Sequence, residues 1–226
     1  MDGQFSAREF SGAPISNDAA PVPSHSAAPP IGIVLEVAGA SSKVVLDAAT
    51  IESLSGDSDP AIAQAGQVGA QLKMRVGSTW LIANVRAMRM LDFDSGRLTA
   101  DIDFLGEGDE EKLTGKLYRF RRGVTRYPVP GNEVFPVSTA DLRQMYAADE
   151  RANIEIGNVY PTKNIRAALY VDSMLGKHFA LLGSTGTGKS TAAALILHRI
   201  CQLAPQGHIV MIDPHGEYGA AFRNSG

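Results

Sequence analysis

The sequence has little cysteine and no large excess of charge of either sign. Cys201 is the single cysteine among 226 residues, so no disulfide can form within the chain, and a reducing compartment is expected. Cys201 lies in an apolar stretch and is expected to be a plain buried thiol. The formal net charge is −3, which excludes a global basic field, so that any contact with nucleic acid must be local.

Long apolar runs are also missing. No stretch approaches the roughly 18 apolar residues that a membrane-spanning helix needs, and the N-terminus has no basic segment followed by an apolar one, as a secretory signal would. A cytoplasmic location is therefore expected. The hydrophobic content of 44% and the charged content of 20% are ordinary for a soluble globular protein.

Residues 1–30 form a segment of distinct composition. They hold five of the twelve prolines, together with many alanines and serines. Such a segment cannot bury enough apolar surface to offset the entropy lost on ordering. We expect a disordered tail.

Residues 31–135 change to short runs with a β pattern, separated by glycine-rich turns. Alternation is clear from Leu98 to Leu105, and Gly77-Ser78 makes a tight connection. An acidic loop is expected at 106–111. The expected strands are 31–37, 43–46, 68–76, 79–91, 98–105 and 113–124. Strands of this number and length predict a small antiparallel barrel or sandwich.

A connector of mixed structure is expected over 136–170. Ser138 and Asp141 have the spacing of a helix cap, which predicts a short helix over 139–147. The runs 154–159 and 165–171 predict a hairpin around residues 160–164.

The run from Gly183 to Thr191, GSTGTGKST, fits the pattern G-x-x-x-x-G-K-[ST] of a phosphate-binding loop. The apolar run 178–182 before it predicts a buried parallel strand. The apolar stretch 191–203 after it predicts a buried helix. Strand, glycine loop and helix form the context that this motif requires, whereas the alternative is a chance turn containing a lysine.

Each residue type in this loop suits the binding of ATP with Mg²⁺. Glycines allow the backbone N–H groups to form a concave nest for phosphates, and the following helix points its positive end at the same place. Lys189 is expected to reach the β- and γ-phosphates, and the Ser190 hydroxyl to coordinate Mg²⁺. The expected nucleotide-binding residues are Gly183, Ser184, Thr185, Gly186, Thr187, Gly188, Lys189, Ser190 and Thr191.

A second acidic motif follows. The apolar run 208–212 predicts another buried strand, which ends in Asp213-Pro214-His215-Gly216-Glu217-Tyr218. Because the carboxyl ends of parallel strands share one rim, Asp213 and Glu217 are expected near the phosphate loop. With Lys189 they are the candidate catalytic residues, orienting water or metal. The alternative is a polar turn that only links the strand to a neighbour.

Basic residues gather on and after one expected strand, with Tyr118 and Phe120 among them. They could face DNA phosphates or a neighbouring subunit, but a solvated strand that faces the acidic loop is the favoured interpretation. The cluster is Lys116, Arg119, Arg121, Arg122 and Arg126.

Taken together, these motifs resemble the HerA branch of the HerA/FtsK ATPases. The resemblance rests on the run 178–191, on Ile212 to Tyr218, and on segments of the β region that are similar to the family's HAS-barrel. Those segments are Ile31-Gly32-Ile33-Val34, Tyr127-Pro128-Val129-Pro130-Gly131 and Ile156-Gly157. The resemblance implies a ring-shaped, usually hexameric, ATP-driven DNA translocase that works with a nuclease in DNA processing or defence.

The sequence departs from the family at its end. It stops at Gly226, about forty residues after the phosphate loop, whereas family members continue with strands that supply the Walker B carboxylates, a sensor and an arginine from the neighbouring subunit. On that resemblance Asp213 is a rim residue rather than the principal metal ligand. A truncated product or fragment is expected, with a complete short protein as the alternative, and hydrolysis by this chain alone is left open.

The expected fold class is α+β: a small antiparallel β-barrel followed by the start of a P-loop α/β domain of RecA-like (ASCE) type. The expected division is a tail (1–30), a HAS-like barrel (31–135), a connector (136–170) and the first part of the ATPase domain (171–226). Two other functions stay open. One is a motor of the conjugation or secretion type, and the other is a nucleotide-binding assembly module that does not hydrolyse ATP.

Overall fold

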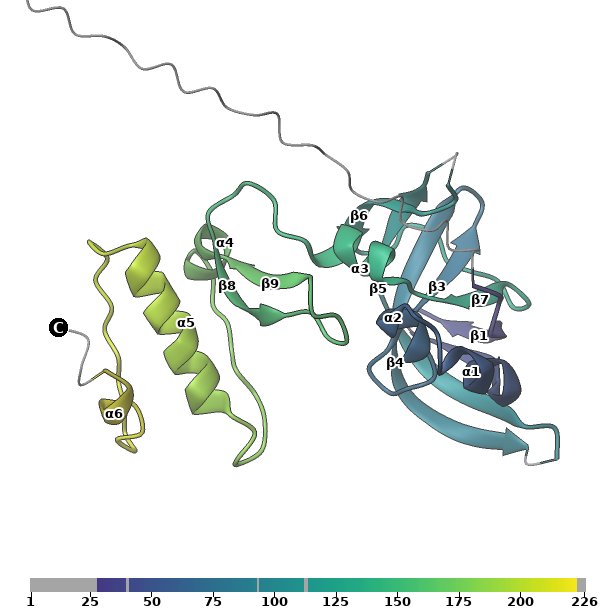
Figure 1. Ribbon diagram of the computed structural model, residues 1–226, viewed down its shortest axis with the longest axis horizontal. Coiled ribbons are helices and arrows are strands. Elements are labelled where there is room, and N and C mark those ends of the chain that lie inside the picture. The colour runs from purple at the N-terminus through teal and green to yellow at the C-terminus, as the bar shows by residue number, and fades with distance from the viewer. Residues whose placement is uncertain (1–27, 40, 93, 112–113, 223–226) are drawn as a thin grey trace, which may run out of the picture.

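Seven strands build the N-terminal half of the protein, and all their pairings are antiparallel. The computed structural model describes residues 28–39, 41–92, 94–111 and 114–222, so most of the expected tail lies outside the described residues. The strands are β1 (Gly32–Ala38), β2 (Ser41–Asp47), β3 (Gln71–Val76), β4 (Thr79–Asp92), β5 (Arg97–Glu110), β6 (Leu117–Arg122) and β7 (Glu133–Pro136). Their order is β2-β1-β7-β3-β4-β5-β6, and an additional pairing of β2 with β5 closes all but β6 into a barrel. The predicted antiparallel barrel is confirmed (Figure 1).

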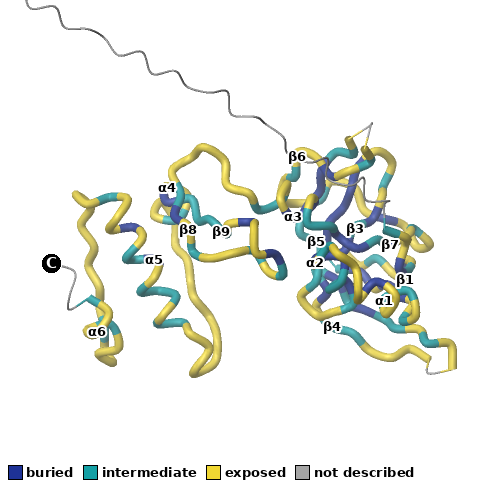
Figure 2. Tube along the Cα trace, viewed as in Figure 1, coloured by how far each residue is buried: buried dark blue, intermediate teal, exposed yellow. Residues whose placement is uncertain are grey.

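Strand β4 carries apolar side chains on both faces. Leu81, Ala83 and Val85 belong to the cluster inside the barrel, whereas Trp80 and Ile82 belong to a second cluster on the outside. The second cluster also contains Leu142 of α3 (Thr139–Tyr146) and Ile165 of the connector. Buried residues accordingly concentrate in the barrel (Figure 2).

The acidic loop expected at 106–111 is wrong, because most of this segment is the end of β5. Gly106 and Gly108 lie under Phe120 and Leu117 of β6, whose side chains occupy the space that a Cβ would need. Glycine in a strand permits this close approach. Glu107, between the two glycines, is fully buried.

Helices α1 (Ala48–Leu54) and α2 (Pro60–Ala63) were not expected. Each begins after an aspartate that caps it: the Asp47 carboxylate accepts from Thr50 N at 2.7 Å, and the Asp59 carboxylate accepts from Ala61 N at 2.9 Å. Asp59 also accepts from Thr139 N at 2.8 Å. One aspartate therefore joins α2 to the start of α3.

The short helix and the hairpin predicted after the barrel are both present. Ser138 and Asp141 form a capping box at the start of α3, and β8 (Asn153–Asn158) pairs antiparallel with β9 (Arg166–Tyr170). Helix α4 (Val171–Leu175) follows. The hairpin lies between the barrel and α5 (Lys189–Leu203) in Figure 1, and its Ile154 packs with Ile196 and Ile200 of α5.

Two expected strands are not formed within the described part of the chain. Residues 178–182 and 208–212 have no strand assignment, and Leu182 and Val210 are 90% and 91% exposed. An apolar pattern predicts a preference for burial, but a strand also needs a neighbour that pairs with its N–H and C=O groups.

Helix α5 forms where it was expected, but the expectation that it is buried is wrong. Only Ile196 and Ile200 of this helix are buried, and Cys201 is exposed. The helix packs on one side against the hairpin, and its other apolar residues are half-buried or exposed. The last helix, α6 (Gly219–Phe222), follows the acidic motif. Among the described residues, no helix combines the length and apolar character needed to cross a membrane.

Candidate functional site

The glycine loop leads directly into α5. Gly188 is the N-cap of the helix with φ +86°, and Gly186 has φ +83°. Both values lie in the left-handed region, where a residue with a Cβ is strained. Within the described residues no side chain caps this helix start, so its first backbone N–H groups remain available to an anion. The exposed loop therefore has the backbone that a phosphate nest requires.

The side chain of Lys189 lies over the loop. Its Nζ donates to the Ser184 carbonyl oxygen at 2.7 Å, and the Thr187 hydroxyl donates to the same oxygen at 2.7 Å. A Cβ at Gly183 would lie 2.6 Å from Thr187 Oγ1. The lysine ammonium and the Thr187 hydroxyl thus meet at one carbonyl of the loop, and glycine at its first position leaves room for Thr187. Thr185 and Thr191 are exposed.

The acidic motif meets the start of α5. The Ser190 hydroxyl donates to the Glu217 carboxylate. The Asp213 carboxylate accepts from Glu217 N at 3.2 Å and from Tyr218 N at 3.0 Å. The structure therefore brings Ser190, Glu217 and Asp213 together. Glu217 contacts Ser190 directly, whereas Asp213 contacts the backbone of Glu217.

A second contact ties this turn to α5 and was not predicted from the sequence. His198 Nε2 lies 2.9 Å from the Ala221 carbonyl oxygen, and its ring stacks on Phe222 at 4.6 Å between centroids. A lone histidine in an apolar helix carries no pattern that identifies such a partner. The contact fixes the residues after Glu217 along the side of α5.

The composition of the site suits a cation that is bound partly by protein oxygens and partly by the phosphates of a bound ligand. In the described residues no group of three or more His, Cys, Asp or Glu side chains could hold a metal ion. Mg²⁺ commonly binds through one or two protein oxygens together with substrate phosphates. The Ser190 hydroxyl beside the Glu217 carboxylate matches that mode.

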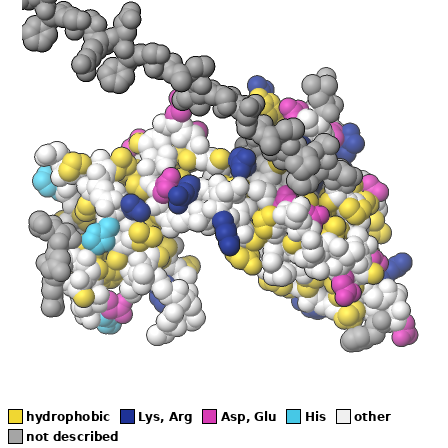
Figure 3. All heavy atoms as spheres, viewed as in Figure 1, with side chains coloured by type: hydrophobic (Ala, Val, Ile, Leu, Met, Phe, Trp, Pro, Cys, Tyr) yellow, Lys and Arg dark blue, Asp and Glu magenta, His cyan; other side chains and the backbone are white. Residues whose placement is uncertain are grey.

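Two of the basic residues of β6 each have a neighbour that contacts the charged group. Arg121 pairs with the buried Glu107 at 2.6 Å and approaches Asp109 at 3.8 Å. The Arg119 guanidinium lies 5.1 Å from the ring centroid of Tyr118. On the face drawn in Figure 3, acidic and basic side chains are interspersed. The interpretation of a strand that faces acidic neighbours fits Arg121.

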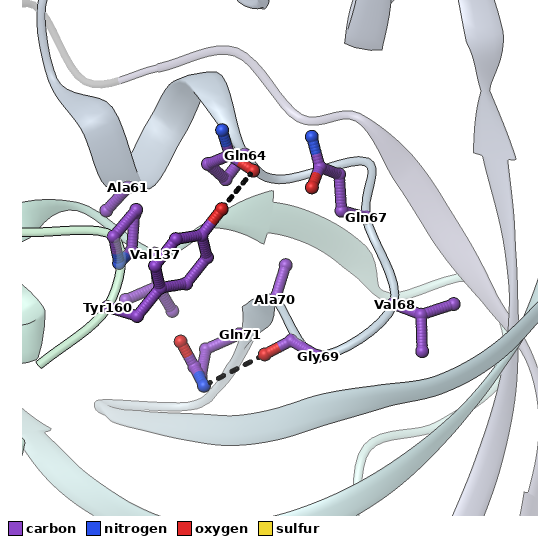
Figure 4. A pocket seen from close by; sticks show the side chains of 10 residues that line it. Ala61, Gln64, Gln67, Val68, Gly69, Ala70, Gln71, Val137 and Tyr160 are labelled. Atoms are coloured by element: carbon purple, nitrogen blue, oxygen red, sulfur yellow. Dashed lines mark hydrogen bonds between the residues drawn. The ribbon is translucent and has the colours of Figure 1, made fainter. Parts of the chain in front are cut away.

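A pocket lies where the β8–β9 turn meets the barrel (Figure 4). Tyr160 reaches over it, and its hydroxyl donates to Gln64 Oε1 at 3.3 Å. None of the ten residues that line it is charged. It therefore offers no carboxylate, ammonium or guanidinium group, and it lies on the barrel rather than at the glycine loop.

The C-terminal part of the chain matches a known protein family. Residues 154–226 match the family model described as helicase HerA, central domain. The chain is 33% identical over 147 residues to the DNA double-strand break repair helicase HerA of Pyrococcus furiosus, which covers 62% of this chain and 25% of that protein. It is 31% identical over 148 residues to the probable DNA double-strand break repair helicase HerA of Methanocaldococcus jannaschii, covering 65% of this chain and 28% of the relative. The chain thus spans about a quarter of the length of these relatives.

Proposed function

We propose that the C-terminal segment of this chain, which is similar to HerA proteins, binds ATP with Mg²⁺ as part of an ATP-driven DNA helicase. The observation that carries the proposal is the pair of left-handed glycines at the uncapped start of α5, with Lys189 and Ser190 as its first two residues. A polyphosphate is the ligand that satisfies backbone N–H groups, a helix terminus and an ammonium at once.

In this proposal each loop residue has its own role in binding the nucleotide and the cation. The N–H groups of residues 183–191 surround the phosphates, and Lys189 leaves the Ser184 carbonyl to contact the β- and γ-phosphates. Ser190 supplies a hydroxyl ligand to Mg²⁺, which neutralises phosphate charge when bound. Asp213 and Glu217 hold the turn that faces this ligand.

The proposal extends to the whole protein through its relatives, whose names describe DNA double-strand break repair helicases. We take DNA as the polymer acted on, a homo-hexameric ring as the working assembly, a nuclease as the partner and the cytoplasm as the location. Residues 31–135 would serve as the HAS-like barrel, 136–170 as the connector and 171–226 as the first part of the ATPase domain.

The first test is the affinity for ATP of a Lys189→Ala variant. Removing a charge-assisted contact is expected to weaken binding by about 1.5–3 kcal/mol, measured by calorimetric titration with a non-hydrolysable analogue. Lys177→Ala, which removes an exposed lysine before the loop, is the matched control and should bind as the unaltered chain does. Equal affinity in both variants would contradict the role of Lys189.

A further inference from the structure

One hydrogen bond connects the start of α5 to the turn that follows residue 212, and two more order that turn. The Ser190 hydroxyl donates to the Glu217 carboxylate, although 27 residues separate them in the chain. The Asp213 carboxylate in turn accepts the N–H groups of Glu217 and Tyr218, at 3.2 and 3.0 Å. The position of Glu217 is thus set by Asp213, and the direction of the Ser190 hydrogen is set by Glu217.

The direction of that hydrogen matters for metal binding. A serine hydroxyl has one hydrogen to donate and two lone pairs to offer. When the hydrogen points at a carboxylate, both lone pairs are free for a cation, and the oxygen becomes a better donor of electron density. Carboxylates that orient metal ligands in this way change metal affinity without touching the metal.

From this geometry we infer that Glu217 is a positioning residue, held by Asp213, that turns the Ser190 hydroxyl toward the divalent cation of a bound nucleotide. The inference rests on the proposed function, because it concerns the same phosphate loop. It assigns Glu217 a role through Ser190 rather than as a direct ligand.

The charge of Glu217 adds a second effect with a distinct signature. A carboxylate beside the loop repels the phosphates of a metal-free nucleotide and attracts the cation of a metal-bound one. Removing the charge should therefore move the two affinities in opposite directions. A residue that only stabilises the turn would lower both together.

The experiment measures binding of a fluorescent, non-hydrolysable ATP analogue, first in excess EDTA and then across a Mg²⁺ titration. In Glu217→Gln the Mg²⁺ concentration for half-maximal binding should rise about tenfold or more, while affinity in EDTA should stay the same or increase. Asp213→Ala, which frees Glu217 from its tether, should raise the Mg²⁺ requirement in the same direction. Asp172→Asn, an exposed acid in α4, is the control and should behave as the unaltered chain.

The outcomes separate this inference from the proposed function. If the unaltered chain at saturating Mg²⁺ binds the analogue no more tightly than Lys189→Ala does, the proposed function fails. If binding is normal but Glu217→Gln and Asp213→Ala keep the original Mg²⁺ requirement, the inference alone is overturned. Circular dichroism of each variant checks the fold, and should Glu217→Gln fail to fold, the Mg²⁺ requirement of Asp213→Ala decides.

Discussion

At the scale of single residues, Glu107 shows how the barrel holds a fully buried charge. Its carboxylate accepts from Arg121 Nη2 at 2.6 Å, from Thr125 N at 2.9 Å and from the Thr125 hydroxyl at 2.8 Å. Burial raises the pKa of this carboxyl, but the hydrogen bonds from Thr125 and Arg121 outweigh burial and hold the pKa below its ordinary value of 4.5. These bonds tie β5 to β6 and to the segment after it.

Replacing Glu107 should therefore reduce stability in a way that depends on pH. Because the pKa is lower in the folded state, ionised Glu107 stabilises the fold above about pH 4.5, and this contribution is lost as the pH falls through the folded-state pKa. Glu107→Gln should lower the free energy of unfolding by about 1.5–3 kcal/mol at neutral pH, and the difference from the unaltered chain should shrink in acid. Urea denaturation at several pH values measures this.

Asp109→Asn provides the comparison. The Asp109 side chain is 51% exposed, and its carboxylate lies 3.8 Å from Arg121, which is a long distance for an ion pair. That variant should change stability by no more than about 0.5 kcal/mol. If the free energy of unfolding lost in Glu107→Gln did not vary with pH, the contribution of Glu107 to stability would come from the shape of its side chain and not from its charge.

At the scale of elements, β4 is the strand on which both apolar clusters depend. Leu81 is fully buried inside the barrel. Leu81→Ala should lower the free energy of unfolding by about 2–5 kcal/mol, because it removes buried atoms and leaves a cavity. Val129→Ala, at a position 61% exposed, should have little effect. Chemical denaturation of the two variants measures the difference, and similar values would place Leu81 outside the stabilising core.

The elements also show which features follow from the sequence. Strands β1 to β6, the capped helix α3 and the glycine loop were predicted because local pattern and local structure agree there. Strand β7 has four residues, too few for a periodic signal, and the capped helices α1 and α2 were missed. The end of β5 was taken for a loop because its glycines and acids are typical of turns, although here the glycines admit β6.

The site was predictable in its loop but not in its contacts. The pattern G-x-x-x-x-G-K-[ST] placed Lys189 and Ser190 at the start of a helix, where the structure has them. The hydrogen bond from Ser190 to Glu217 and the contact of His198 with the chain near Phe222 depend on how a distant turn folds back on α5. Residues 178–182 and 208–212 looked like strands because apolar composition records a preference for burial, not the presence of a pairing neighbour.

At the scale of the whole molecule, the barrel and the C-terminal segment have separate apolar clusters. The barrel clusters draw on β1 to β7 and α3, whereas Ile196 and Ile200 of α5 pack with Ile154 of β8 and Val171 of α4. A ligand bound at the glycine loop should therefore order the C-terminal segment without changing the barrel.

Amide hydrogen exchange on the intact chain, with and without a non-hydrolysable ATP analogue and Mg²⁺, tests the central claim most directly. We predict slower exchange over residues 183–191 and 213–218 when the nucleotide is present, unchanged exchange in β4 and β5, and weaker protection in Lys189→Ala at the same nucleotide concentration. Protection that appeared in the barrel instead, or none at residues 183–191, would contradict the assignment of this loop as the nucleotide site.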